Sequence, residues 1–138
     1  MTTITEIKSN PKILVVDDNE DVLEILRKRL GATNYEVITA NNAAAAMTAL
    51  LDEKQKPDVV VLDIMMPGIS GYDVLDLINK KVKNPPPVIV YSAHEDVDER
   101  VAGKEALVYG YVVKGNTASL LIETISKALG SVGRKIKS

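Results

Sequence analysis

Four short apolar runs in this sequence each end on a polar, chemically reactive side chain. The runs occupy residues 13–16, 59–62, 88–91 and 111–113 and consist mainly of valine, isoleucine and leucine. Stretches with the helical spacing of apolar residues separate them. Short, uninterrupted, β-branched runs are typical of strands in a parallel sheet that helices cover on both faces. The sequence therefore predicts an α/β fold.

The order of the expected elements predicts the topology of this sheet. The expected strands cover residues 12–16, 35–40, 58–62, 87–91 and 110–113. The expected helices cover a segment that ends at Gly31, and then residues 42–51, 70–83, 96–107 and 117–129. Consecutive parallel strands in one sheet are joined by right-handed crossovers. We expect a flavodoxin-like three-layer sandwich with strand order 2-1-3-4-5. The polar and apolar alternation of the second strand favours an edge position for it.

The composition is that of one small domain. The chain has 138 residues, of which 46% are hydrophobic, and this suffices for one core but not for two. We expect a core over residues 12–129, a polar N-terminal extension over residues 1–10 and a basic, solvated tail over residues 130–138. The chain has no cysteine, which excludes disulfides and thiolate metal sites.

Charge and hydropathy exclude two classes of partner. The net charge is −2, from 17 basic and 19 acidic residues, so no overall field attracts nucleic acid or a membrane surface. No apolar stretch is long enough to span a bilayer, and the N-terminal segment lacks the apolar region of a signal peptide. We therefore expect a cytoplasmic domain that binds neither membrane nor, directly, nucleic acid.

The polar residues that end the strands form the candidate site. Asp17 and Asp18 follow the first strand, Asp63 the third, Ser92 the fourth and Lys114 the fifth. Parallel strands have their carboxyl ends at one edge of the sheet, where open α/β sheets bind ligands. The predicted strand order puts the first and third strands side by side. The sequence therefore predicts three carboxylates, a hydroxyl and an ammonium group around one crevice.

Each of these residues also has an ordinary explanation. Asp17 and Asp18 fit a solvated strand end or a negative charge at a helix N-terminus. Asp63 fits a turn, and Lys114 fits a surface position. The placement of all of them at one sheet edge favours a shared site.

At these residues the sequence resembles the receiver domain of two-component response regulators, the family of the chemotaxis response regulator. The resemblance covers residues 12–129 and rests on four segments in order. They are Val-Asp-Asp-Asn-Glu at 16–20, Leu-Asp-Ile-Met-Met-Pro-Gly-Ile-Ser-Gly at 62–71, Tyr-Ser-Ala at 91–93 and Gly-Tyr-Val-Val-Lys at 110–114. The resemblance implies a signalling module whose only chemistry is its own phosphorylation and dephosphorylation.

The resemblance implies a phosphorylation site and a metal site. Asp63 would accept a phosphoryl group from a histidine kinase or a phosphotransfer protein, as a carboxylate nucleophile. Asp17, Asp18 and Asp63, with the backbone carbonyl of Met65, would bind Mg²⁺, a cation that prefers oxygen ligands. The metal would neutralise charge that otherwise repels the phosphoryl group.

The resemblance also implies how the phosphoryl group is bound and sensed. Lys114 and the Ser92 hydroxyl would each contact a phosphoryl oxygen. Ser92 and Tyr111 would form a switch that changes the surface of the fourth helix, fifth strand and fifth helix, where a partner binds or a weak dimer of otherwise monomeric chains forms. Met65 and His94 would tune the lifetime of the phosphorylated state. Core packing for Tyr111 and an exposed loop position for His94 remain alternatives.

Two features depart from the family pattern. Gly115 follows Lys114 where receivers commonly have a proline joined by a cis peptide, so the next loop is expected to take another path. Leu107 and Val108 stand before the fifth strand, where receivers frequently have Gly-Ala.

Two other functions use related sites. A phosphatase of the haloacid dehalogenase type also has a nucleophilic aspartate and Mg²⁺, but it needs a second aspartate two residues later, where Met65 stands. A flavin carrier needs a phosphate-binding loop of amides and hydroxyls after the first strand, where Asp17 and Asp18 stand.

Overall fold

The computed structural model describes residues 10–93, 107–115 and 118–137, with side chains up to residue 130. The strands are β1 (Lys12–Val16), β2 (Glu36–Ala40), β3 (Val59–Leu62), β4 (Val88–Ser92) and β5 (Val108–Val113). The helices are α2 (Glu20–Ala32), α3 (Ala43–Leu51), α4 (Gly71–Lys81) and α6 (Ser119–Lys137), with a 3-10 turn, η1, at Glu53–Gln55.

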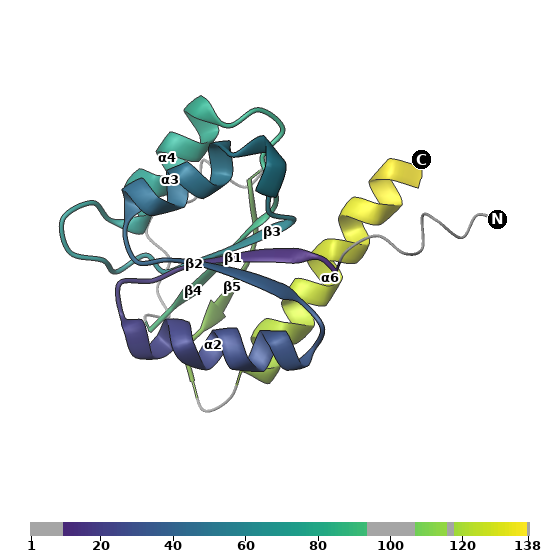
Figure 1. Cartoon of the computed structure of the whole chain (residues 1–138), viewed down its shortest axis with the longest axis horizontal. Coiled ribbons are helices and arrows are strands. Elements are labelled where there is room, and N and C mark those ends of the chain that lie inside the picture. The colour runs from purple at the N-terminus through teal and green to yellow at the C-terminus, as the bar shows by residue number, and fades with distance from the viewer. Residues whose placement is uncertain (1–9, 94–106, 116–117, 138) are drawn as a thin grey trace.

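The five parallel strands form one sheet in the order β2-β1-β3-β4-β5. Helices α3 and α4 cover one face of the sheet, and α2 and α6 cover the other (Figure 1). The predicted three-layer fold, strand order and edge position of β2 are confirmed.

The pairing of β1 with β3 sets the position of the candidate site. Val16 pairs with Leu62 at the carboxyl ends of these strands. Asp63, the residue after β3, continues this pairing, because its backbone N–H donates to the Val16 carbonyl at 2.9 Å. On the other side of β1, the Asp17 N–H donates to the Ala40 carbonyl at 3.1 Å. The backbones of both aspartates are therefore held by the sheet itself.

Each face of the sheet has its own core. Alternate residues of the strands point to opposite faces, so that Leu14 and Leu62 pack toward α3 and α4, while Val15 and Val61 pack toward α2 and α6. The strands β1, β3 and β4 are buried along almost their whole length. This burial explains why their sequences are apolar without alternation.

The end of α2 differs from its prediction. The helix runs through Gly31 to Ala32, and Asn34 takes the left-handed conformation, with φ of 71°. The Tyr35 N–H donates to the Leu30 carbonyl at 3.2 Å and the Asn34 N–H to the Gly31 carbonyl at 3.0 Å. These two bonds form a Schellman motif. The prediction that Gly31 ends the helix was wrong, because asparagine serves here as the residue with positive φ.

The later elements also shift relative to their predictions. Helix α6 continues past Gly130 to Lys137, so its predicted end at residue 129 was wrong; one glycine costs a helix only about 1 kcal/mol relative to alanine. Strand β5 begins at Val108, before a bulge opposite Val88 and Ile89. The predicted helix over 96–107, apart from Leu107, lies outside the described residues. The peptide bond between Lys114 and Gly115 is trans, as are all peptide bonds among the described residues.

A glycine at the start of α4 allows the helix to approach the candidate site. Ser70 caps α4 in a capping box with Asp73, as predicted. The Gly71 N–H donates to the Ile64 carbonyl at 2.9 Å. A Cβ atom at Gly71 would lie 2.6 Å from the Cα of Ile64 and closer still to the carbonyl oxygen of Asp63. No side chain fits there unless the backbone after β3 moves.

We expect Gly71→Ala and Gly31→Ala to change stability in opposite directions. Gly71→Ala should lower the free energy of unfolding by about 1–3 kcal/mol, the usual cost of overpacking. Gly31 is helical and has no atom within 4 Å of an added Cβ, so Gly31→Ala should raise it by about 0.5–1 kcal/mol. Urea unfolding of both variants tests this. Equal effects of the two substitutions would contradict the close approach at Gly71.

Candidate functional site

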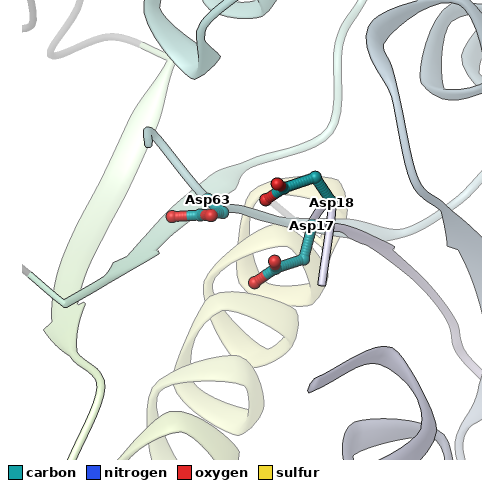
Figure 2. A group of neighbouring side chains, drawn as sticks. All are labelled: Asp17, Asp18 and Asp63. Carbon is teal, nitrogen blue, oxygen red and sulfur yellow. The ribbon is translucent and has the colours of Figure 1, made fainter. Parts of the chain in front are cut away.

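Three carboxylates gather at the carboxyl ends of β1 and β3. Figure 2 shows the side chains of Asp17, Asp18 and Asp63 together at this edge of the sheet. One oxygen from each lies within 4.8 Å of the others. Asp17 is 2% exposed and Asp63 is 5% exposed, whereas Asp18 is exposed. Two of the three charges are therefore largely removed from water.

Backbone amides orient the two buried carboxylates. The Asn19 N–H donates to Oδ1 of Asp17 at 2.9 Å, and the Met65 N–H donates to Oδ1 of Asp63 at 3.2 Å. Asn19 is in turn held as the N-cap of α2, where its side chain accepts from the amides of Asp21 and Val22. These bonds leave the Oδ2 atoms of both aspartates to face the rest of the site.

Lys114 brings one ammonium group to the carboxylates. Its Nζ lies 2.7 Å from Oδ2 of Asp17 and 3.6 Å from Oδ2 of Asp63. The backbone supports this position, because the Lys114 N–H donates to the Ser92 carbonyl at 2.7 Å. The Nζ also lies 5.8 Å from the centre of the Tyr91 ring, within reach of a cation–π interaction. One cation is thus shared between the two buried carboxylates.

The surroundings raise the pKa of Asp63 above its ordinary value of 3.8. Burial is the largest cause, because it disfavours the charged form, and the nearby charge of Asp17 acts in the same direction. Lys114 and the Met65 amide lower the pKa, but less. Burial likewise raises the pKa of the Tyr91 hydroxyl. Ionised Asp63 is therefore under electrostatic strain that a further cation would relieve.

The arrangement fits a small divalent cation. An octahedral Mg²⁺ binds oxygens at about 2.0–2.1 Å, so that ligands on opposite sides of it lie about 4.2 Å apart. One carboxylate oxygen from each of Asp17, Asp18 and Asp63 lies within 4.8 Å of the others, which is close to that spacing. All three donors are hard oxygens, which suit such an ion. The predicted acidic cluster is confirmed as a group that can hold a metal.

Comparison with known proteins identifies the family. Residues 13–126 match the family described as the response regulator receiver domain. The chain belongs to this family. The signalling role predicted from the sequence is thereby confirmed, and the phosphatase and flavin-carrier alternatives lose their basis.

The receiver domain resembles both longer regulators and isolated domains. It is 38% identical over 121 residues to the transcriptional regulatory protein PrrA of Mycobacterium tuberculosis, across 88% of this chain and 51% of that protein. The chain thus spans about half the length of this curated relative.

Solved structures of response regulators have the same fold as this chain. The response regulator TrrA of Thermotoga maritima, in complex with Mg²⁺ and BeF, is 34% identical, with a TM-score of 0.75 over 86% of this chain and 99% of that one. A CheY-like receiver domain of Methanospirillum hungatei is 25% identical, with a TM-score of 0.78 over 90% of this chain and 98% of that one.

Three further predicted site residues belong to the described part of the chain. Ser92 is 5% exposed at the end of β4. Tyr111 lies on β5, where it pairs with Val90 of β4, and is 43% exposed. Met65 is 55% exposed, and its backbone N–H contacts Asp63. His94 lies outside the described residues. Among the described residues no helix is long and apolar enough to cross a membrane.

Three contributors to the receiver site were missed in the sequence. Asn19 had a usable signal, since asparagine before acidic residues is typical of a helix start. Gly71 follows the cap residue of α4, and a glycine at a helix start is only a weak indication that the helix approaches another segment closely. Tyr91 reads as one more apolar strand residue, and nothing local indicates that Lys114 comes over its ring. Their roles depend on contacts between distant segments.

Replacing Asp63 should stabilise the metal-free receiver domain at neutral pH. The pKa of Asp63 is higher in the folded state than in the unfolded state, so ionisation of Asp63 lowers the free energy of unfolding. This loss begins as the pH rises past the ordinary pKa and is complete above the folded-state pKa. Asp63→Asn should therefore unfold at higher urea concentration than the parent at pH 7 in EDTA. The difference should vanish as the pH falls to about 3.8 or below. Asp21→Asn, at an exposed acid, controls for the loss of one charge; a pH-independent difference would contradict the strain at Asp63.

Proposed function

We propose that Asp63 accepts a phosphoryl group from the phosphohistidine of a histidine kinase or phosphotransfer protein. The observation that carries the proposal is a buried carboxylate, Asp63, next to two further carboxylates and the Lys114 ammonium. In the transfer, a carboxylate oxygen of Asp63 forms a bond to phosphorus as the phosphorus–nitrogen bond to the donor imidazole breaks. The imidazole leaves with the electron pair of that bond, and Asp63 becomes an acyl phosphate.

The neighbouring residues have distinct parts in this step. Asp17, Asp18 and Asp63, with the Met65 carbonyl, would hold Mg²⁺. Bound there, the metal would supply positive charge that offsets the repulsion between an anionic phosphoryl group and the carboxylates. Lys114 exchanges its contact with Asp17 for one with a phosphoryl oxygen, which its Nζ, 3.6 Å from Oδ2 of Asp63, is placed to reach. The domain thus phosphorylates itself and later hydrolyses its own acyl phosphate, without turnover of another substrate.

The phosphoryl group is read by Ser92 and Tyr111. Phosphorylation adds negative charge and strong acceptor oxygens at Asp63, to which the Ser92 hydroxyl moves as a donor. Tyr111, half-exposed on the neighbouring strand, then turns toward the space beside β4. This changes the surface of β5 and α6, which with the predicted fourth helix, outside the described residues apart from Leu107, binds the partner or a second copy. Met65, beside the site, and His94 set the rate at which water reaches the acyl phosphate.

The relatives support a proposal for the setting of this signal. PrrA is named a transcriptional regulatory protein, and it extends well beyond the region shared with this chain. We infer a downstream partner or an attached output region that acts on transcription, with the receiver domain itself making no direct contact with nucleic acid. The domain acts in the cytoplasm, as a monomer or weak dimer.

Acetyl phosphate should label Asp63 alone, and only with Mg²⁺. Asp63→Asn should abolish labelling measured by intact-protein mass, because Asp17 is already paired with Lys114 at 2.7 Å and Asp18 is an exposed carboxylate. Lys114→Met should slow labelling about 100-fold, the usual loss when one charge-stabilising donor is removed. Asp18→Asn should slow it about tenfold or more at fixed Mg²⁺, by weakening metal binding.

Controls separate this result from other chemistry. Asp21→Asn should label at the parent rate, and EDTA should stop labelling of the parent. Mg²⁺-dependent labelling of Asp63→Asn at the parent rate would refute the proposal, and so would steady turnover of phosphate esters without labelled Asp63.

Ser92→Ala should accept the phosphoryl group but fail to transmit it. With beryllofluoride and Mg²⁺, amide NMR shifts in the parent should extend from the loop after Asp63 to Tyr111 on β5. In Ser92→Ala they should stay within the loops around Asp63, because the hydroxyl that links the two strands is gone. Ser126→Ala, on the exposed side of α6, should behave as the parent. Parent shifts that leave Tyr111 unchanged would reject the switch.

A further inference from the structure

A hollow of about 340 Å³ lies between the C-terminal ends of α3 and α4. These helices lie on the same face of the sheet (Figure 1). Leu50, Leu51 and Val82 form the apolar part of its lining. Leu50 and Val82 are buried, but Leu51 is 51% exposed. The hollow therefore presents apolar surface to solvent.

The hollow is separate from the phosphorylation site. In a parallel α/β fold, each connecting helix runs back against the direction of the strands, so its C-terminal end lies at the amino edge of the sheet. Asp17 and Asp63 stand at the carboxyl edge. The hollow thus lies at the opposite edge, and no step of the proposed phosphoryl transfer uses it.

Positive charge surrounds the apolar lining. Lys56, Lys81 and Lys83 line the hollow together with one carboxylate residue, Glu53. All three lysines are exposed. The chain as a whole has a net charge of −2, so this edge has the opposite sign to the average surface. Of the residues next to these in the sequence, Lys54 and Lys80 add to the positive charge, and Asp52 offsets one of them.

Helix dipoles explain only part of this charge. Lys80 and Lys81 occupy the last turn of α4, where a positive side chain stabilises the dipole. Lys56 comes from a different segment, after η1, and its Nζ donates to the Lys83 carbonyl at 3.4 Å. That contact brings positive groups from two separate loops to the same opening.

The backbone on one side of the hollow is restricted. Asn84, which also lines it, has a positive φ of 51°, and three prolines follow at 85–87. Proline rings hold φ near −65°. A restricted wall loses less conformational entropy when a ligand binds.

We propose that this hollow docks an acidic segment of a protein partner, with an apolar side chain placed against Leu51 and Val82 and carboxylates beside Lys56 and Lys83. The apolar lining favours such a segment over a free phosphate or a nucleic-acid backbone, neither of which has a group to bury there. Charge complementarity supplies the attraction. A volume near the low end of ligand pockets fits one or two side chains.

A synthetic peptide of glutamates around one central leucine is the probe. Amide NMR titration of the full chain at low salt should show saturable shifts at Leu51, Lys56 and Lys83. Replacing the central leucine of the peptide by glycine should weaken binding several-fold. Asp63→Asn should bind the peptide as the parent does, so this result is independent of the proposed phosphorylation.

Paired variants separate a specific surface from general charge. Lys56→Glu with Lys83→Glu should weaken peptide binding about tenfold, because two favourable charge pairs become repulsive. Lys28→Glu with Lys127→Glu changes the net charge equally, at exposed lysines on α2 and α6, and should have little effect. Leu51→Ser should also weaken binding, whereas Leu120→Ser, at the 56% exposed residue of α6, should not.

Three results would overturn the proposal. The first is the absence of saturable shifts around the hollow. The second is an equal loss of affinity in the two charge-reversed pairs, which shows a general charge effect. The third is tighter binding of a short DNA duplex to the same amides with no dependence on Leu51, which identifies a nucleic-acid surface instead.

Discussion

The parallel pairing of β1 with β3 is the contact on which the site depends. Two aspartates that lie far apart in the sequence become neighbours because Val16 and Leu62 end their strands at the same level. The bond from the Asp63 N–H to the Val16 carbonyl extends this pairing by one residue. Burial of both strands on both faces keeps the register, since a shift by one residue would exchange the faces of every side chain.

The same pairing forces like charges together in the folded protein. Lys114 compensates part of that charge, but burial and Asp17 still raise the pKa of Asp63. A site that binds a cation and then a phosphoryl group would bind the cation more tightly with this arrangement. The carboxylates that attract the cation are already in place, so no protein movement is needed. Functional sites commonly carry like charges of this kind at some cost in stability.

The α/β topology also separates two kinds of surface. The strand ends with their acidic residues occupy one edge of the sheet, and the C-terminal ends of α3 and α4, with lysines around an apolar hollow, occupy the other. Between them lie two apolar cores, one packed on each face of the sheet. Two partners of different chemistry can therefore contact the domain without competing for the same residues.

The sequence by itself determined the elements, their order and the identity of the acidic cluster. Apolar runs that end on Asp17, Asp63 and Lys114 are local patterns, and the handedness of crossovers restricts the strand orders that can join them. The sequence did not reveal that Asn34, and not Gly31, would take positive φ, because both residue types can end a helix. Nor did it predict that α6 would continue past Gly130.

Only the tertiary structure decided the contacts between distant segments. It places the Lys114 ammonium at 2.7 Å from Asp17 but 3.6 Å from Asp63, and it brings α4 so near to β3 that position 71 has no room for a side chain. It also brings Lys56 to the Lys83 carbonyl. These contacts depend on the packing of helices against the sheet to within a few tenths of an ångström, and periodicity along one segment carries no information about its distance from another.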